Sequence, residues 1–550
     1  MKNKIFPVVT VSVALLFGSS CTKDFQTINT DPNAIPANAI HFSSLFTNAE
    51  LITSGNSDGN AYEDWRGNLI YASCMIQHLS STAGYWDGDK YFDNASYLSA
   101  YWDQDFGPQV SSTNPLLNGN ASPILNIEEV VANTAKDSSN VNLYNMARIF
   151  RVFQFQRLTD MYGDIPYSQA GQGYISGINA PVYDKQQAIY NNMLSELQDA
   201  ASKLTASGAT PGAADLIYAG NVTQWQRFAY SEMVRIAMRL SKVDPTTAQK
   251  WVQIAVTGGV FQSNADNAII IHQAAAANGA GSQVANGTGS VLSIIDQNSS
   301  RLSETFVNYL KTTNDPRLSY LGTVCTSTPA GPGNSADMGD TSAAVQLGQP
   351  NGYDNLGGMT DISNAPNWPG TAGVDSAKWQ AEYSVVNRYT FARTNAPTFF
   401  LTYGETELLL AEAAQRGWIT GSASSYYTNG VQGAMVQLAL QAGAGPDAAS
   451  ISAYLTANPL TAGSELKLIN TQYWVASFMD ETESWANWRR SGFPVLTPVS
   501  YVGNATGATI PRRYTYPTGE AGTNSANYES AVSGLTNGDK MTSRVWWDAP

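Results

Sequence analysis

The sequence predicts a mainly α-helical protein whose helices pair with their neighbours and are joined by long irregular loops. Apolar residues recur at spacings of three and four in several separate segments. Helix-capping and helix-breaking residues stand where those segments begin and end. Polar stretches without periodicity run between them. Periodicity alone therefore indicates a helix-rich protein. A helical-repeat scaffold is one architecture that fits, although the spacing is irregular and no consensus repeat runs through the chain.

The first expected helix pair spans residues 143–204. Apolar residues from Leu143 to Leu158 follow helical spacing, and Gly163 and Pro166 mark the end of that helix. The segment from Tyr183 to Leu204 repeats the pattern. Two antiparallel helices joined by a short turn are the unit of a tetratricopeptide-type array.

Two further pairs are expected, at 223–258 and 403–440. The first begins with a helix from about Thr223 to Lys242, after which Asp244 suits an N-cap and Pro245 the first position of the next helix. The second consists of Tyr403–Gln415 and Tyr426–Leu440.

Two stretches rich in Gly, Ser, Asn, Thr and Pro, residues 274–290 and 326–372, separate these blocks. Loops this long in a compact protein are usually functional or disordered. Three aromatic residues near the second stretch favour function in part: Tyr353, Trp368 and Trp379. There is no clean linker, so a single domain over residues 21–550 is expected.

The composition favours contact with uncharged polar molecules. Charged residues make up only 13% of the chain and hydrophobic residues 43%, so Asn, Ser, Thr, Gly and Gln replace the missing charge. Without residues 1–20, which contain Lys2 and Lys4, 28 basic and 44 acidic residues remain, a net charge of −16. This acidic balance argues against a nucleic-acid partner, because phosphate binding needs clustered Lys and Arg.

Residues 1–20 have the pattern of a cleaved signal peptide. A short basic region precedes an apolar core, and small residues stand before Cys21. The position of Cys21 is typical of the lipidation site of a bacterial lipoprotein; the alternative is an ordinary signal with a chance cysteine. The apolar run is too short to span a bilayer, so the lipid would be the membrane anchor. Cys74 and Cys325 are expected to be buried thiols, although one disulfide between them also fits.

The densest cluster of candidate binding residues lies between Tyr85 and Phe106, where aromatic residues alternate with Asp, Asn and Gln. A saccharide presents apolar C–H faces and hydroxyl-rich edges, and an exposed ring beside short amide and carboxylate groups matches both. Most rings in proteins are buried, so the expectation is at least one exposed platform, with Trp86 favoured. The candidate ligand-binding residues of this region are Tyr85, Trp86, Asp87, Asn94 and Trp102.

Tyr353, Trp368 and Trp379 form a second candidate set. Trp368 stands between two prolines, which limits its burial in a regular element. We predict no metal site and no cofactor: Asp87-Gly-Asp89 lacks the remaining ligands of a calcium loop, and the three histidines are far apart. Asp480–Glu483 invites a glycosidase interpretation, but a solvated helix surface is the simpler one, and no catalytic motif is present.

Six separated motifs carry a resemblance to a known family. They are Leu158–Tyr167 (LTDMYGDIPY), Tyr183–Tyr190 (YDKQQAIY), Trp225–Arg239 (WQRFAYSEMVRIAMR), Asn314–Leu318 (NDPRL), Leu408–Gly417 (LLLAEAAQRG) and Trp485–Pro494 (WANWRRSGFP). In this order, behind a lipoprotein-type N-terminus, they resemble the SusD/RagB family of outer-membrane nutrient-binding lipoproteins.

The resemblance implies four tetratricopeptide-like helix pairs wrapped by long loops that carry the ligand site, and a protein that is not an enzyme. It also implies a lipid-anchored place on the outer face of the outer membrane and a SusC-like TonB-dependent transporter as partner. An oligosaccharide or polysaccharide is the leading ligand. The alternatives are a peptide ligand, a surface glycosidase, and a helical scaffold for other proteins.

Overall fold

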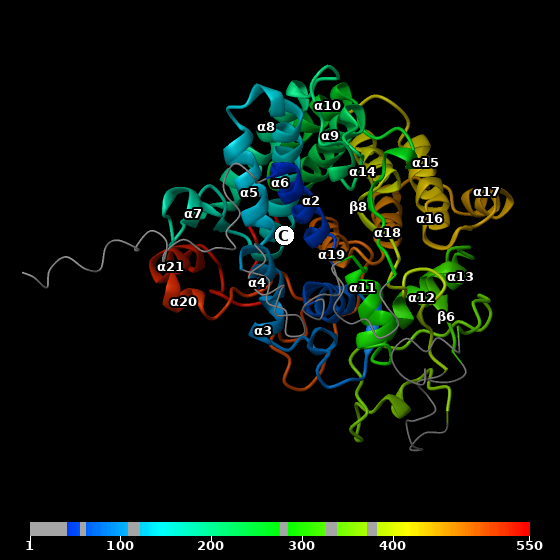
Figure 1. Cartoon of the computed structure of the whole chain (residues 1–550). Helices are drawn as coiled ribbons and strands as arrows, with labels where there is room; N and C mark the ends of the chain where they lie inside the picture. Colours follow the sequence, from blue (N-terminus) through cyan, green and yellow to red (C-terminus); the bar gives the residue numbers. More distant parts are fainter. Residues whose placement is uncertain (1–40, 56–61, 108–121, 275–283, 326–337, 371–381) are drawn as a thin grey trace, which may run out of the picture. The chain divides into compact units, whose positions relative to one another are not determined.

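Helices that pack against their sequence neighbours make up most of the chain in the computed structural model (Figure 1). The structure describes residues 41–55, 62–107, 122–274, 284–325, 338–370 and 382–550. The chain divides into two units, Met1–Phe42 and Ser43–Pro550, and the description below concerns the second.

Four helix pairs form the scaffold within the described residues. Both members of each pair contact one another, and the pairs follow in chain order, with α8 against α9, α9 against α14 and α14 against α18. Their bounds are α6 (Val141–Tyr162) with α8 (Gln186–Lys203), α9 (Val222–Arg239) with α10 (Pro245–Gly258), α14 (Tyr403–Gln415) with α15 (Ala423–Val436), and α18 (Glu465–Ala476) with α19 (Glu481–Ser491). The mainly α, helix-pair fold expected from the sequence is confirmed. Only the second helix of the third pair differs, because it breaks into α15 and α16 (Leu438–Ala442).

Short polar residues start the scaffold helices where the sequence places them. The Asp244 side chain accepts a hydrogen bond from the backbone N–H of Thr247 at 3.0 Å, and Pro245 is the first residue of α10. At α14, Thr402 and Glu405 form a reciprocal capping box. The local sequence thus determines where these helices start, and the packing of their apolar faces determines how they are arranged.

The remaining helices are shorter and lie mostly in the connections. They are α2 (Phe42–Thr53), η3 (Glu63–Ser73, a π-helix), η4 (Asp87–Asp89), α3 (Ala95–Leu98), α4 (Ala100–Phe106), α5 (Pro123–Thr134), η6 (Ser138–Asn140), α7 (Gln172–Ser176), η7 (Gly212–Ala214), η8 (Asn264–Asp266), α11 (Gly287–Ser290), η9 (Val291–Ile295), α12 (Glu304–Thr312), α13 (Leu318–Leu321), η10 (Ile362–Asn364), α17 (Ala448–Ala457), α20 (Glu520–Thr523) and α21 (Ser525–Ser533).

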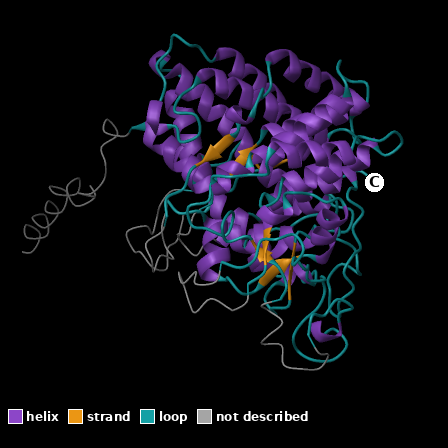
Figure 2. Ribbon diagram, turned by 90° about the vertical axis from the view of Figure 1, so that its right-hand side faces the viewer, coloured by secondary structure: helices purple, strands orange, loops and turns teal. Residues whose placement is uncertain are grey.

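The strands form two-stranded antiparallel ladders, which Figure 2 shows beside the helices. They are β1 (Leu79–Ser81) with β5 (Ser300–Leu302), β2 (Ile165–Pro166) with β3 (Tyr183–Asp184), β4 (Ala268–Ile270) with β8 (Thr398–Leu401), and β6 (Gly322–Thr323) with β7 (Val385–Val386). Each ladder joins segments far apart in sequence or clamps the turn after a helix, so the ladders fix where the loops lie.

Helix α19 lies inside the protein and not on its surface. Its residues from Glu481 to Arg490 are all buried. The Glu483 carboxylate accepts from the Arg239 guanidinium of α9, and the Asp160 carboxylate of α6 accepts from the same guanidinium at 3.1 Å. The expected solvated surface at Asp480–Glu483 is therefore wrong: Glu483 pairs with arginines of α9, and the Glu481 carboxylate lies 2.6 Å from the His78 ring nitrogen. Arg489 stacks on Trp485, as its i, i+4 spacing suggests, with 3.8 Å between the guanidinium carbon and the ring centre.

Cys74 and Cys325 are both buried thiols, as expected. Within the described ranges, no helix is both long enough and apolar enough to cross a membrane. Cys21 and the expected signal peptide lie outside the described residues.

Candidate functional site

The ladder of β1 and β5 places two distant loops side by side. Ser81 pairs with Ser300 in its antiparallel register, so the chain leaves β1 beside the segment that enters β5. The Ser81 hydroxyl also donates to the backbone oxygen of Ser299 at 2.6 Å. Tyr85 and Trp86, which follow β1, therefore lie next to Asp296, which precedes β5.

Three aromatic side chains converge on the carboxylate of Asp296. The indole N–H groups of Trp65 and Trp86 donate to its Oδ2 atom at 2.8 and 2.9 Å. The Tyr85 hydroxyl donates to Oδ1 at 2.6 Å, and the Ser299 hydroxyl donates to the same oxygen. Trp65 belongs to η3, so the cluster unites three separate stretches of the chain.

Tyr85 and Trp65 form a corner at the surface, called the ring corner below. Their ring centres are 6.3 Å apart and their planes are inclined by 81°. Tyr85 is 40% exposed, and Trp65 is partly exposed. With two rings at this angle, a ligand group can stack on the face of one ring while the other ring contacts its edge. The expected exposed platform in this region is present in the structure.

The favoured exposed ring, Trp86, is instead fully buried. Its indole N–H points to Asp296, and the turn that carries it folds back on η3. The ring that remains at the surface is that of its neighbour Tyr85. Burial and the hydrogen bond to Asp296 raise the pKa of the Tyr85 hydroxyl, which therefore stays protonated.

The acids of this loop hold it in place. Asp87 is buried and accepts from the side-chain amide of Asn94 at 2.7 Å, so these two predicted binding residues bond to each other. Asp89 is fully buried, pairs with Lys90 at 3.4 Å and accepts from the Asn351 amide at 2.6 Å. The acids that alternate with the rings in this loop therefore hold the loop in place beneath the exposed Tyr85.

Trp102, also predicted to bind ligand, lies in an aromatic core. It is 5% exposed and packs against Tyr162, Tyr183 and Tyr516 at ring-centre distances of 5.3, 5.5 and 5.7 Å. A ring enclosed in this way stabilises the scaffold and has little surface left for a ligand.

The second predicted set is split. Tyr353 and Trp368 are partly buried against a small hydrophobic cluster of Ile362, Ala365 and Tyr383. Trp379 lies outside the described residues. Asn351 joins this segment to the first region through its bond to Asp89 and a second one to the Leu79 backbone oxygen at 2.8 Å.

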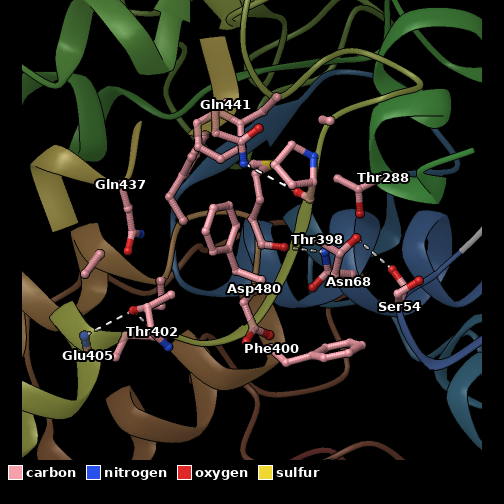
Figure 3. A pocket seen from close by; sticks show the side chains of 18 of the residues that line it. Ser54, Asn68, Thr288, Thr398, Phe400, Thr402, Glu405, Gln437, Gln441 and Asp480 are labelled. Carbon is pink, nitrogen blue, oxygen red and sulfur yellow. Dashed lines mark hydrogen bonds between the residues drawn. The ribbon is translucent and has the colours of Figure 1, made fainter. Parts of the chain in front are cut away.

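A partly open cavity of about 90 Å³ lies between η3, β8 and the helix pairs (Figure 3). Thr398 forms part of the cavity wall, and the Thr398 hydroxyl donates to the Ser54 backbone oxygen at 2.9 Å. Burial raises the pKa of Asp64 to about 7 and that of Asp480 to about 6 at the same wall. Pockets for drug-sized ligands measure roughly 300–1,000 Å³, so this cavity is too small for an oligosaccharide. The ring corner is the better candidate site.

The described part of the chain contains no group of three His, Cys, Asp or Glu residues placed to hold a metal ion. Sequence reasoning missed Trp65 and Asp296. Trp65 stands in a Tyr-Glu-Asp-Trp run that resembles Tyr85-Trp-Asp87, a signal that was available. Asp296 is a lone acid in a polar loop, and only the fold shows its partners.

The sequence profile of the SusD-like family, described as "Starch-binding associating with outer membrane", matches residues 41–517. The chain belongs to the SusD-like family. Among solved structures, a chitin-binding protein is 32% identical to it, with a TM-score of 0.77 over 93% of this chain and 100% of that one. A SusD-like protein from Bacteroidetes is 26% identical, with the same TM-score and the same coverage of both chains.

A SusD homologue from Bacteroides uniformis has the same fold at 22% identity, with a TM-score of 0.72 over 93% of this chain and 100% of that one. No curated protein matches the sequence. The family is described as starch-binding and as associated with the outer membrane, and this SusD-like protein is a member of that family of binding proteins and not an enzyme.

Proposed function

We propose that this SusD-like protein captures a glycan on the outer face of the outer membrane and delivers it to a SusC-like TonB-dependent transporter. In this proposal, residues 1–20 are removed, Cys21 carries the lipid anchor, and residues 21–550 act as one domain. The ligand docks on the ring corner, and Tyr353, Trp368 and Trp379 form a second contact region.

The exposed, perpendicular pair of Tyr85 and Trp65 is the observation that carries the binding site. A pyranose ring has apolar C–H faces that stack on aromatic rings, and the second ring closes one side of the stacked sugar. Both rings are held through their polar atoms by Asp296, so they are in place before the ligand arrives. Such preorganisation lowers the entropy cost of binding.

Chitin-type chains are the first ligands to test. The 32% identical relative is described as a chitin-binding protein. An N-acetylglucosamine chain is uncharged and adds an acetamido methyl group to its apolar ring faces, which suits a protein with only 13% charged residues. Starch, named in the family description, is the second ligand class to test.

The decisive experiment is electrophoresis of the soluble 22–550 protein in native gels, each cast with one soluble polysaccharide, including glycol chitin, starch and anionic glycans. Retardation by glycol chitin or another neutral glycan, without release of reducing ends, is the expected result. Mobility unchanged in every gel would refute glycan capture, and mass spectrometry of co-purifying peptides would then test the peptide alternative.

Tyr85→Ala tests the site itself. Removing one stacked ring should weaken binding of the retarding glycan about tenfold, since such a contact contributes roughly 1 kcal/mol or more. Tyr426→Ala is the matched control, because it removes a partly exposed tyrosine ring from α15 in the scaffold. Equal binding by both variants would show that the glycan binds elsewhere.

Cys21→Ala tests the anchor separately. The variant should move from the membrane fraction to the soluble fraction of the cells that make it, because the lipid is attached through that thiol. Retention of the variant in membranes would refute anchoring through Cys21 and leave the glycan experiment unaffected.

A further inference from the structure

Asp296 stands directly after η9, and its side chain is turned into the protein. The residue is 7% exposed. Its two carboxylate oxygens receive four side-chain donors, two on each oxygen: the indoles of Trp65 and Trp86 on Oδ2 and the hydroxyls of Tyr85 and Ser299 on Oδ1.

This set of donors uses the whole acceptor capacity of the carboxylate. A carboxylate has about four lone-pair sites, and all four are filled by protein groups. A sugar hydroxyl could reach Asp296 only by displacing one of them. The residue is therefore not built to contact ligand, and its effect on binding passes through the rings that it holds.

The four donors differ in what they tolerate. An indole N–H can only donate, so Trp65 and Trp86 need an acceptor at Oδ2. The hydroxyls of Tyr85 and Ser299 donate or accept, so they tolerate either an oxygen or an N–H group at the Oδ1 position. An asparagine at position 296 can turn its oxygen to the indoles and its amide nitrogen to the hydroxyls, whereas alanine leaves both indoles without an acceptor.

We propose that Asp296 is the positioning residue of the ring corner: it fixes Trp65 at a right angle to Tyr85, and this angle sets the affinity for a stacked saccharide. The proposal rests on glycan binding at the ring corner. It also defines the ligand chemistry there. The polar atoms of both rings face inward, so recognition uses ring faces, and the buried carboxylate behind them disfavours anionic saccharides such as uronates or sulfated sugars.

The test compares Asp296→Ala, Asp296→Asn and the control Ser299→Ala. Ser299→Ala removes a hydroxyl that donates to Asp296 and lies 2.6 Å from the Tyr85 hydroxyl, and it leaves the direct bonds of both rings to Asp296 in place. Each variant of the 22–550 protein is measured in two ways. The first is affinity for the N-acetylglucosamine hexamer by calorimetry, or for the retarding polysaccharide by affinity electrophoresis. The second is the indole ¹H–¹⁵N NMR signals of Trp65 and Trp86, assigned with Trp→Phe variants, and their hydrogen exchange.

Asp296→Ala should weaken binding about tenfold, the loss expected when one stacked ring is no longer held. It should also shift both indole signals and speed their exchange with solvent. Asp296→Asn and Ser299→Ala should stay within about threefold of wild type and keep both indole signals protected, because an acceptor for the indoles remains.

Three results would overturn the proposal: wild-type indole signals in Asp296→Ala, wild-type affinity in Asp296→Ala, or an Asp296→Asn variant as weak as Asp296→Ala. If Asp296→Ala does not fold, Trp65→Phe, which deletes only the indole N–H and part of the ring, replaces it and must lower affinity. The NMR readout needs no ligand. If the wild-type protein binds no glycan, the proposed function fails, while the indole signals still decide whether Asp296 holds the rings.

Discussion

The carboxylate of Glu412 offers a direct test of how the buried charges stabilise this fold. Its two oxygens accept from the Arg490 guanidinium at 2.7 and 2.8 Å, and the side chains of both residues are only 1% exposed. Arg416 bonds to the same carboxylate at 2.8 Å but is 26% exposed. Arg490→Met and Arg416→Met therefore break two ion pairs of the same acid, one buried and one near the surface.

The two substitutions should differ severalfold in free energy of unfolding. Removing one partner of a buried pair costs about 3–5 kcal/mol when the other charge stays buried and unpaired. Arg490→Met leaves Glu412 with only the partly exposed Arg416 as a charged partner, so a loss at the lower end of that range is expected. Exposed i, i+4 pairs contribute about 0.3–0.5 kcal/mol, and the loss in Arg416→Met should lie nearer that value, because Arg416 is partly hydrated and Glu412 keeps its buried partner. Although burial by itself raises the pKa of Glu412, Arg490 overrides that effect and lowers it to about 2. In Arg416→Met, Glu412 keeps Arg490 and stays ionised.

The measurement is equilibrium unfolding in guanidinium chloride at pH 7, with thermal unfolding as a second readout. For a unit the size of Ser43–Pro550, the entropy of unfolding is on the order of 1 kcal/mol/K, so Arg490→Met should lower the thermal midpoint by about 3–5 °C and Arg416→Met by less than about 1 °C. If Arg490→Met is no less stable than Arg416→Met, the buried pair does not stabilise the fold and this reasoning is wrong.

Three further predictions concern pH, a close backbone approach and a thiol. Burial raises the pKa of Glu405 to about 8 and that of Glu232 to about 7. Both groups hold their proton more tightly in the folded state, so the stability that they contribute is lost as the pH rises from about 4.5 to 8. The free energy of unfolding should be lower at pH 8.5 than at pH 5.5, and an unchanged pH slope in Glu405→Gln would contradict the assignment. Gly88→Ala should displace the turn that carries Tyr85, because a methyl group at position 88 overlaps the backbone oxygen of Ile70. The affinity for glycan should drop at least tenfold, and wild-type affinity would show that the turn accommodates the methyl group. Cys74 is fully buried, which raises the pKa of its thiol, so it should react with a thiol reagent only after denaturation, and fast reaction in the native protein would contradict its burial.

Much of the fold was predictable because its signals are local. The helix expected at 143–158 is α6, and the residues expected to start α10 do so with the bonds that their chemistry implies. The interior position of α19 was not predictable. Its Glu and Arg residues have the pattern of a solvated surface. The partner of Glu483 is Arg239, some 240 residues away, and the sequence does not show that the two side chains meet.

The candidate site was predictable as a region and not as a set of residues. An aromatic-rich loop after β1 indicated a platform, and Tyr85 provides it. Which of two adjacent rings faces solvent depends on Asp296, which reaches Trp86 through the β1–β5 ladder. No local pattern contains that information.

The interior location of α19 has a consequence for the order in which the chain can assemble. Arg235 and Arg239 of α9 lie in the protein interior, and the carboxylate that both approach belongs to Glu483, near the end of the scaffold. A chain that has emerged only as far as α15 already contains Asp160 and Glu405, which also pair with these arginines, but it lacks the carboxylate that the two arginines share. The charge pairing of the early helices is therefore completed only when α19 packs against them, so the scaffold from α6 to α19 should reach its full stability as one cooperative unit.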